Sequence, residues 1–279
     1  AESPRGNMFE LPIVAVKPYY GSSILYMTVR EMTKHYIKNK DEEPSEINAI
    51  MIIDDPNDKR FDVPKIEEIK GLIKRGAFRL VPRSTVPEGA NILKGRFVLA
   101  IKEPDTPLQK FKARFVVQGH RDPQKQIMVT EAPTILRYSV RLLIAIATTY
   151  NFSMWTRDVT QAYIQSQSDL LREIYLEPPK DLGFPDDQVI RVVKPHYGIT
   201  EAGSYWWQTS LSYHLGDLRM KQATLDPCLF YKKEKDSLEG LEASQVDDTL
   251  SAGTEKFMRL EEDKSQKFDV KPDRKSTRL

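Results

Sequence analysis

A pair of adjacent aspartates is the feature that most constrains this chain. In Gln245-Val246-Asp247-Asp248 the two carboxylates stand next to apolar residues, a pattern that suits a tight hairpin holding a metal ion, although solvated turns also carry aspartate pairs. A third aspartate, Asp158, lies 89 positions upstream of Asp247, at the end of a short predicted strand from Thr156 to Val159. We therefore expect three carboxylates from distant parts of the sequence to share one site, because hard cations require oxygen ligands.

The composition is that of an ordinary globular protein. With 279 residues, 40% hydrophobic and 29% charged, the chain has room for one or two packed domains. Apolar runs such as Leu142 to Ala147 are far shorter than the roughly 20 residues that cross a bilayer. The first residues show no secretory signal pattern. These features predict no membrane partner and an intracellular location, cytoplasmic or nuclear.

Cysteine and histidine usage argues against a structural zinc site. Cys228 is the only cysteine, which excludes an internal disulfide and is expected to be a small buried hydrophobe. The four histidines are scattered without metal-ligand spacing: His35, His120, His196 and His214.

Positive charge is concentrated in one stretch of the chain. Between Lys94 and Lys125 there are eight basic and three acidic residues, a local charge of +5 within a total of only +2. Such a stripe can hold phosphate, or it can be the solvated face of a hairpin.

The pattern of apolar residues and turn signals predicts alternating strands and helices. A helix is expected from Asp62 to Arg75, with Asp62 as its N-cap and Gly76 beyond its end. A basic hairpin follows, with strands at 96–102 and 112–118 turning through Pro104 to Pro107. Further strands are predicted at 78–81, 156–159, 174–176, 189–193 and 228–232, and helices at 139–149, after Asp158 around Ala162 and Ile164, and at 201–215.

An ordered series of motifs gives this pattern a family. The chain carries Glu67-Glu68-Ile69-x-x-Leu72, Arg96-Phe97-Val98, Lys112 to Gly119, Ala132-Pro133-Thr134 with Arg137, Asp158-Val159-x-x-Ala162-Tyr163, Glu173 to Leu176 with Pro178-Pro179, Lys194-Pro195-x-Tyr197-Gly198-x-x-Glu201-Ala202-Gly203-x-x-Trp206, Asp226 to Leu229, and Gln245 to Asp248. In this order the chain resembles the reverse transcriptase of copia-type long-terminal-repeat retrotransposons, most closely the fungal versions. No single motif is decisive, but the ordered series is specific.

The resemblance implies a fold and an activity. The fold would be α+β, of the right-hand polymerase type, with fingers and a palm whose antiparallel sheet is backed by helices. It would divide into an N-terminal extension or linker (1–60), a fingers-like region (61–150), a palm-like catalytic region (151–270) and a truncated tail (271–279). The activity would be RNA-directed DNA polymerisation, in which a deoxynucleotide is joined to a primer 3′-hydroxyl on an RNA or DNA template with two Mg²⁺ ions, or with Mn²⁺. The alternative is an inactive remnant that at most binds nucleic acid without sequence preference through the basic stripe.

The resemblance also assigns roles to individual residues. Asp158 and Asp247 would ligate the metal ions, with Asp248 as a third catalytic carboxylate and the Val159 carbonyl as a further ligand. Tyr163 resembles the steric gate that rejects a ribose 2′-hydroxyl, although an ordinary core aromatic would look the same. The candidates for contacting the triphosphate are Lys102, Lys112 and Arg114, and the sequence does not choose among them.

Several positions need a structural explanation. Glu201 stands where many relatives carry glutamine, so it is expected to face away from a triphosphate or to be neutralised. Trp206 and Trp207 are expected to be core residues. The strand before Gln245 contains Glu239 and Glu242, and because buried charge is costly these side chains are expected to point to solvent or to leave the hairpin poorly packed. Thumb and ribonuclease H regions are expected after residue 279 in the family, so an oligomer or partner could supply them.

Overall fold

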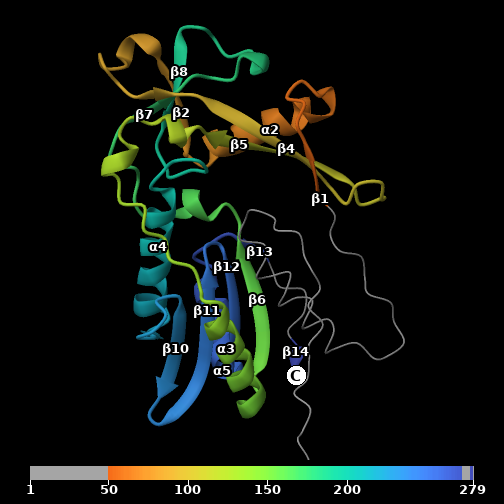
Figure 1. The fold of residues 1–279 in the computed structure, drawn as a ribbon, viewed down its shortest axis with the longest axis vertical. Coiled ribbons are helices and arrows are strands. Elements are labelled where there is room, and N and C mark those ends of the chain that lie inside the picture. Colours follow the sequence, from red (N-terminus) through yellow and green to blue (C-terminus); the bar gives the residue numbers. More distant parts are fainter. Residues whose placement is uncertain (1–49, 272–276, 279) are drawn as a thin grey trace, which may run out of the picture.

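Three β-sheets built from distant parts of the chain form the framework of the molecule (Figure 1). The computed structural model describes residues 50–271 and 277–278. Most of the predicted N-terminal extension, and residues 272–276 and 279 of the predicted tail, lie outside the described residues. Within the described part of the chain, no helix is long and apolar enough to cross a membrane.

The first sheet contains the basic hairpin and is called the hairpin sheet. Its order is β1 (Ile50–Ile53), β4 (Gly95–Lys102) and β5 (Lys110–Val117), all antiparallel. Leu99, Ile101 and Phe115 are buried on one face, whereas the alternate residues of β5 reach the other, open face. The prediction of a basic hairpin is confirmed.

Helix α2 (Asp62–Lys74) packs against β5 and begins differently from the prediction. Asp62 is the first helical residue and makes no capping hydrogen bond at the N-cap position, which Phe61 occupies. The turn before it, η1 (Lys59–Phe61), is capped instead by Asp58, whose side chain accepts from the Arg60 amide. The predicted cap at Asp62 was therefore wrong, because a short 3₁₀ turn precedes the helix and moves the capping role upstream.

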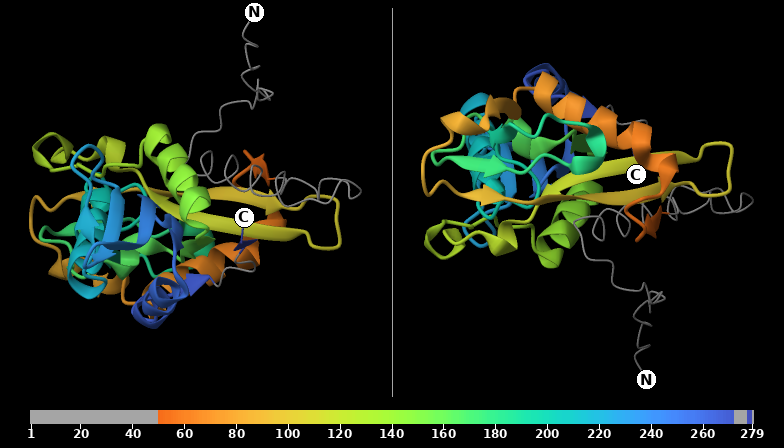
Figure 2. Two further views of the ribbon diagram at one scale, coloured as in Figure 1. Left: turned by 90° about the horizontal axis from the view of Figure 1, so that it is seen from below. Right: turned by 90° about the horizontal axis from the view of Figure 1, so that it is seen from above.

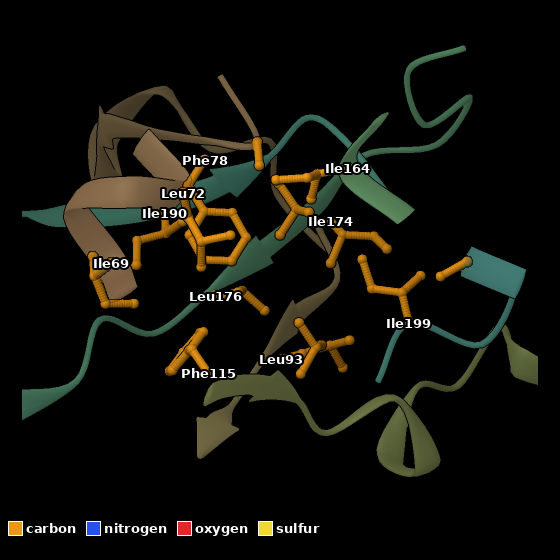
Figure 3. Close-up of a cluster of buried hydrophobic side chains, with 14 residues drawn as sticks. Ile69, Leu72, Phe78, Leu93, Phe115, Ile164, Ile174, Leu176, Ile190 and Ile199 are labelled. Carbon is orange, nitrogen blue, oxygen red and sulfur yellow. The ribbon is translucent and has the colours of Figure 1, made fainter. Parts of the chain in front are cut away.

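The second sheet has four strands and encloses a large apolar cluster. Its order is β2 (Phe78–Pro82), β8 (Gln188–Val192), β7 (Ile174–Leu176) and β3 (Ile92–Leu93), with only β3 and β7 parallel among these pairs. Figure 3 shows how Phe78, Leu176 and Ile190 from this sheet meet α2 and Phe115 of the hairpin sheet. This shared core holds the hairpin sheet and the four-stranded sheet together.

The third sheet, called the main sheet, carries the predicted aspartates. Its order is β13 (Val270–Lys271), β6 (Ser153–Val159), β12 (Asp248–Gly253), β11 (Ser237–Gln245), β10 (Leu229–Glu234) and β9 (Lys221–Gln222); β14 (Thr277–Arg278) also pairs with β6. All its pairs are antiparallel. The predicted strand at 156–159 and the aspartate hairpin are thus neighbours.

Helices cover both faces of the main sheet (Figure 2). Helix α3 (Arg137–Tyr150) lies on one face, where Leu143 packs with Met154 and Leu250. Helix α5 (Glu255–Ser265) lies on the other face, where Phe257 packs with Trp155 and Phe230. Helix α4 (Ala202–Ser212) continues into a π-helical turn, η7 (Tyr213–Asp217), whose side chains join this second cluster. The remaining short 3₁₀ turns are η2 (Arg83–Thr85), η3 (Gly119–Arg121), η4 (Lys125–Ile127), η5 (Ala162–Gln165) and η6 (Lys180–Leu182).

The predicted poor packing of the charged strand β11 was wrong. Glu242 does not point to solvent: it is only 2% exposed, and its Oε1 lies 2.7 Å from His214 Nε2 on η7. The cost of burying the carboxylate is offset by this partner, which comes from a helix that the strand sequence does not reveal. Glu239, by contrast, is partly exposed and accepts a hydrogen bond from the Thr254 hydroxyl.

Candidate active site

Strand pairing brings the predicted carboxylates to one end of the main sheet. Asp158 and Asp248 are directly opposite each other in the β6–β12 pair, which places their Cα atoms about 5 Å apart. The turn holding Asp247 is tied to the same end, because the Val159 amide donates to the Asp247 carbonyl at 2.7 Å. The prediction that these residues meet is therefore correct at the level of the backbone.

The turn between β11 and β12 has an unfavourable backbone. Gln245 pairs with Asp248, so Val246 and Asp247 form a two-residue turn. Val246 has φ 54°, a left-handed conformation that a β-branched residue rarely adopts and that glycine or asparagine would adopt more easily. The Trp206 indole on α4 donates to the Val246 carbonyl and helps to hold this conformation. Strain held by surrounding contacts is frequent where a side chain must be presented at a functional site.

Three further side chains reach this end of the sheet from other elements. The rings of Tyr163 and Tyr197 lie 4.9 Å apart, and the Arg114 guanidinium lies 4.4 Å above the Tyr197 ring. Burial raises the pKa of Tyr197 to about 12, and the negative charges of Asp247 and Asp158 add to the effect. Burial and the Asp247 charge likewise raise the pKa of Tyr163, while Arg114 opposes the shift. Arg114, Tyr163 and Tyr197 therefore share one electrostatic environment with the aspartates.

The three candidate triphosphate ligands lie at different distances from this cluster. Arg114, Lys112 and Lys102 all belong to the open face of the hairpin sheet, where Arg114 is opposite Val98 and Lys112 is opposite Ala100. Lys102 is opposite Lys110, four residues along β5 from Arg114 and hence about 13 Å nearer the hairpin tip. The structure therefore brings Arg114 to the aspartates and leaves Lys102 towards the tip, with Lys112 between them.

Close backbone packing joins the hairpin sheet to the segment before α4. The Val117 amide donates to the Tyr197 carbonyl at 2.9 Å, and the Gly119 amide donates to the Gly198 carbonyl at 3.1 Å. Gly198 has φ +88°, and a Cβ atom there would lie 1.9 Å from the Val117 carbonyl oxygen. Only glycine fits this contact, which places Tyr197 beneath Arg114.

Glu201 is neutralised and does not face the aspartates with an unpaired charge. Its carboxylate accepts two hydrogen bonds from Arg172, at 2.6 and 2.9 Å, and it is 4% exposed. Arg172 also donates to Asp122 at 2.6 Å. Burial alone would raise the pKa of Asp122, but the hydrogen bond from Arg172 helps to lower it. The expectation that Glu201 is neutralised is confirmed, and the counter-ion is a residue that no motif indicated.

A buried group of charged side chains lies directly below the turn. His214 Nδ1 lies 2.6 Å from the Ser210 carbonyl oxygen, which can only accept, so Nδ1 carries a proton and donates it. One further proton then lies between His214 Nε2 and the Glu242 carboxylate. Burial favours the neutral form of both side chains. Even so, Glu242 raises the pKa of His214, and His214 helps to lower the pKa of Glu242 to about 2. The pair is therefore an imidazolium and a carboxylate.

A second buried carboxylate, Glu261 on α5, adjoins this pair. Glu261 accepts hydrogen bonds from the Trp155 indole and from the Ser251 hydroxyl, and it forms an ion pair with Arg157 at 3.2 Å. Burial and the adjacent Glu242 raise the pKa of Glu261 well above its usual range. Glu242 Oε2 has no hydrogen-bond donor among the described side chains, and a proton on Glu261 would supply one. A cavity of about 40 Å³ separates this group from Val246 and Asp247.

The donor set at the turn fits a hard cation. In the described part of the chain no three His, Cys, Asp or Glu side chains form a complete metal centre on their own. Mg²⁺ is commonly held by only one or two carboxylates together with water and substrate phosphates. Asp158 and Asp247, with Asp248 beside them, match such an incomplete set of oxygen ligands.

Two predictions about other side chains are also confirmed, and one site residue was missed. Trp206 is buried, and Trp207 is partly buried against the apolar cluster under α3 and the one under α5. Cys228 is fully buried, and burial raises its pKa to about 12. The family resemblance implies that residues 197–203 line the nucleotide pocket but gives Tyr197 no role of its own, yet its ring joins Arg114 to Tyr163. The neighbouring Gly198 was the only signal in the sequence that this backbone passes unusually close to another.

Comparison with known proteins assigns most of the chain to one family. The family model described as "Reverse transcriptase (RNA-dependent DNA polymerase)" matches residues 77–273, which is well over half of the chain. The matched segment contains Arg114, Tyr163, Tyr197 and all three aspartates.

The similar proteins are polyproteins of transposons. The "Retrovirus-related Pol polyprotein from transposon TNT 1-94" of Nicotiana tabacum is 27% identical over 246 residues, which cover 86% of this chain and 18% of that protein. The "Transposon Ty1-LR3 Gag-Pol polyprotein" of Saccharomyces cerevisiae is 30% identical over 120 residues, 43% of this chain and 7% of that protein. The chain thus spans less than a fifth of the length of these curated relatives. The resemblance to copia-type elements is confirmed, and the chain belongs to the reverse transcriptase (RNA-dependent DNA polymerase) family.

Proposed function

We propose that the chain is the polymerase domain of a copia-type retrotransposon and extends a primer with deoxynucleotides on an RNA template. The main sheet is the palm in this proposal, and the hairpin sheet with α2 is the fingers. The observation that carries the proposal is the convergence of Asp158 on β6, the β11–β12 turn at Asp247, Tyr163 on η5 and Arg114 on β5, from four separate elements. An ordinary solvated turn does not require a basic side chain and an aromatic side chain from distant elements beside its aspartates.

The carboxylates hold the metal ions in the proposed site. Asp158 and Asp247 supply the direct ligands, Asp248 supports them, and the Val159 carbonyl is a further oxygen at the same strand end. Two Mg²⁺ ions bound there supply activation of the primer 3′-hydroxyl and neutralisation of the leaving pyrophosphate. The hydrogen bond from Val159 to Asp247 and the one from Trp206 to Val246 keep the ligands in place without substrate.

The residues around the carboxylates bind and select the nucleotide. Arg114 presents a planar guanidinium that suits phosphate oxygens, and Tyr197 beneath it fixes its direction. Lys112 adds positive charge further along the same strand face. Tyr163 packs beneath the incoming sugar and excludes a 2′-hydroxyl. Lys102 is too far along the hairpin for the same phosphate and would meet the template strand instead.

A second candidate function is nucleic-acid binding without catalysis. The observation that favours it is the open face of the hairpin sheet, where five basic residues line up: Arg96, Lys102, Lys110, Lys112 and Arg114. A surface of this charge binds phosphate backbones whether or not the aspartates hold metal.

Primer extension on an RNA template separates the two candidates. The assay compares the wild type with Asp247→Asn, and with Asp269→Asn as a matched change of an exposed aspartate outside the carboxylate site. The polymerase proposal expects extension by the wild type and the control but not by Asp247→Asn. Absence of extension by the wild type, with salt-dependent duplex binding retained in Asp247→Asn, would support the binding candidate instead.

A further inference from the structure

Helix α3 presents an outer face that no other described element covers. Its inner side is buried on the main sheet through Val140, Leu143 and Ala147. Its outer side consists of residues three, four and seven positions apart, which share one face of a helix. These exposed residues are Arg137, Tyr138, Arg141, Leu142 and Ala145. Tyr138 is 78% exposed and Leu142 is 51% exposed.

The charge of this face is entirely positive. The helix contains two arginines and no acidic residue. Arg137 and Arg141 are one turn apart, about 6 Å along the axis, and form no side-chain hydrogen bond or ion pair with other described residues. Two unpaired guanidinium groups at this spacing suit successive phosphates of one strand, and an exposed tyrosine and leucine beside them suit the apolar faces of sugars.

The position of the helix relates this face to the carboxylates. Met154, Thr156 and Asp158 stand at every second position of β6, so their side chains point to the same face of the main sheet. Met154 packs against α3, so α3 covers that face. The chain runs along α3, turns at Asn151, and returns along β6 to Asp158. The N-terminal turn of α3, with Arg137, is therefore the end nearer the carboxylates (Figure 1). A duplex that extends from the carboxylates along this face of the sheet would pass over α3.

We propose that the outer face of α3 is a contact surface for the primer–template duplex, with Arg137 and Arg141 on the phosphates of one strand and Tyr138 and Leu142 on its sugars. The identity of the duplex rests on the proposed function, but the contact itself does not require catalysis. A protein partner is the less favoured occupant, because the face has no acidic residue to pair with a mixed protein surface and its charges are of one sign.

Duplex binding at increasing salt tests this contact directly. The measurement is the fluorescence anisotropy of a labelled short RNA–DNA hybrid with the wild type, with Arg137→Gln/Arg141→Gln, and with Arg259→Gln as the matched control. Arg259 is an exposed arginine of α5, which covers the opposite face of the main sheet. The double variant is expected to bind about ten- to hundredfold more weakly at low salt, with a salt slope smaller by about 2, while the control binds as the wild type does. Urea unfolding midpoints should be equal, because both arginines are exposed.

Several results would overturn the contact. These are an unchanged affinity and slope in the double variant, an equal loss in Arg259→Gln, or a change in sedimentation of the double variant with duplex affinity intact, which would indicate a protein contact. Primer extension by the same proteins separates this failure from failure of the proposed function. If the wild type extends the primer and the double variant binds the duplex normally, only the α3 contact is contradicted. If the double variant loses duplex binding but the wild type does not extend the primer, only the polymerase proposal is contradicted.

Discussion

At the scale of single residues, the site depends on aromatic rings that fix the position of charged groups. Tyr197 lies between Arg114 and Tyr163, so one ring contacts both the proposed phosphate ligand and the residue proposed to sense the sugar. Both tyrosines are protonated at neutral pH, since the ordinary tyrosine pKa is about 10 and burial raises the pKa of each above that value. The rings therefore act by shape and stacking rather than by charge.

Replacing Tyr163 tests its role in sugar selection. Tyr163→Val removes the ring that would meet a 2′-hydroxyl, and the preference for deoxynucleotides over ribonucleotides is expected to fall by roughly 10- to 100-fold. Tyr163→Phe keeps the ring and should keep the preference. The measurement is the ratio of kcat/KM for the two nucleotides on one primer–template. An unchanged ratio in Tyr163→Val would show that the ring is only a core aromatic.

The sequence identified the charged members of the site but not the contacts between them. Asp158, Asp247 and Tyr163 were found because each stands inside an ordered motif next to a predicted strand. The stacking of Arg114 on Tyr197 joins residues 83 positions apart, and neither propensity nor periodicity reports on such a contact. The ranking of Arg114, Lys112 and Lys102 likewise required the strand register, which the hairpin sequence alone left open.

At the scale of elements, the contact between β5 and the segment before α4 positions the side chains proposed to bind the nucleotide. Gly198→Ala would place a Cβ atom 1.9 Å from the Val117 carbonyl oxygen, in a backbone conformation that alanine rarely adopts. Gly76 has a similar φ of +71° but open space around it, so Gly76→Ala measures the conformational cost alone. We expect Gly76→Ala to cost about 1 kcal/mol of unfolding free energy and Gly198→Ala at least about 3 kcal/mol. Urea unfolding measures both, and equal costs would contradict the tight contact.

The buried ion pair below the turn gives the protein a characteristic pH dependence. The folded-state pKa of His214 is raised, so its contribution to stability is fully present below the unfolded pKa of about 6.5 and is lost as the pH rises through the folded value. Glu261 acts in the same direction, whereas the lowered pKa of Glu242 contributes stability that is lost only as the pH falls from about 4.5 towards 2. The unfolding free energy of the wild type should therefore decline above about pH 4.5 through Glu261, and more steeply above about pH 6.5, where His214 adds to the loss.

Two variants separate the pair from ordinary packing. His214→Phe leaves Glu242 buried without its partner and should cost about 3–5 kcal/mol at pH 6. His214→Phe/Glu242→Leu replaces both groups with apolar ones, and it should regain most of that stability and lose part of the decline above pH 6.5. The measurement is urea unfolding between pH 5 and pH 9. A double variant as unstable as His214→Phe, or one with the full wild-type decline, would contradict the ion pair as its cause.

At the scale of the whole molecule, local signals predicted most elements but not their assembly. The hairpin, the strands at 174–176 and 189–193, and the helices at 139–149 and 201–215 lie within a few residues of the predicted positions, because each has clear periodicity and turn residues. The edge strand β1 was not predicted as a partner of β4, since a four-residue strand in an irregular segment gives little signal. The burial of Glu242 was predicted wrongly, because His214 comes from another part of the chain.

The proposed function assigns different tasks to different sheets. The hairpin sheet carries the basic open face and the main sheet carries the carboxylates. The shared cluster around Phe78 and Phe115 joins the hairpin sheet to the four-stranded sheet (Figure 3). The family match from residue 77 to residue 273 contains every strand of these sheets except β1 and β14. The proposed activity is therefore a property of their joint geometry rather than of any single motif.

The most direct test of the central claim is the single-turnover rate of adding one deoxynucleotide to an RNA-templated primer in Mg²⁺. The account predicts that Asp158→Asn and Asp247→Asn each lower this rate by about a thousandfold or more, because each removes a direct ligand of the ions that stabilise the transferring phosphate. Duplex affinity should stay close to that of the wild type, and Asp269→Asn should react at the wild-type rate. A wild-type rate in either aspartate variant would contradict the assignment of this strand end and turn as a polymerase site.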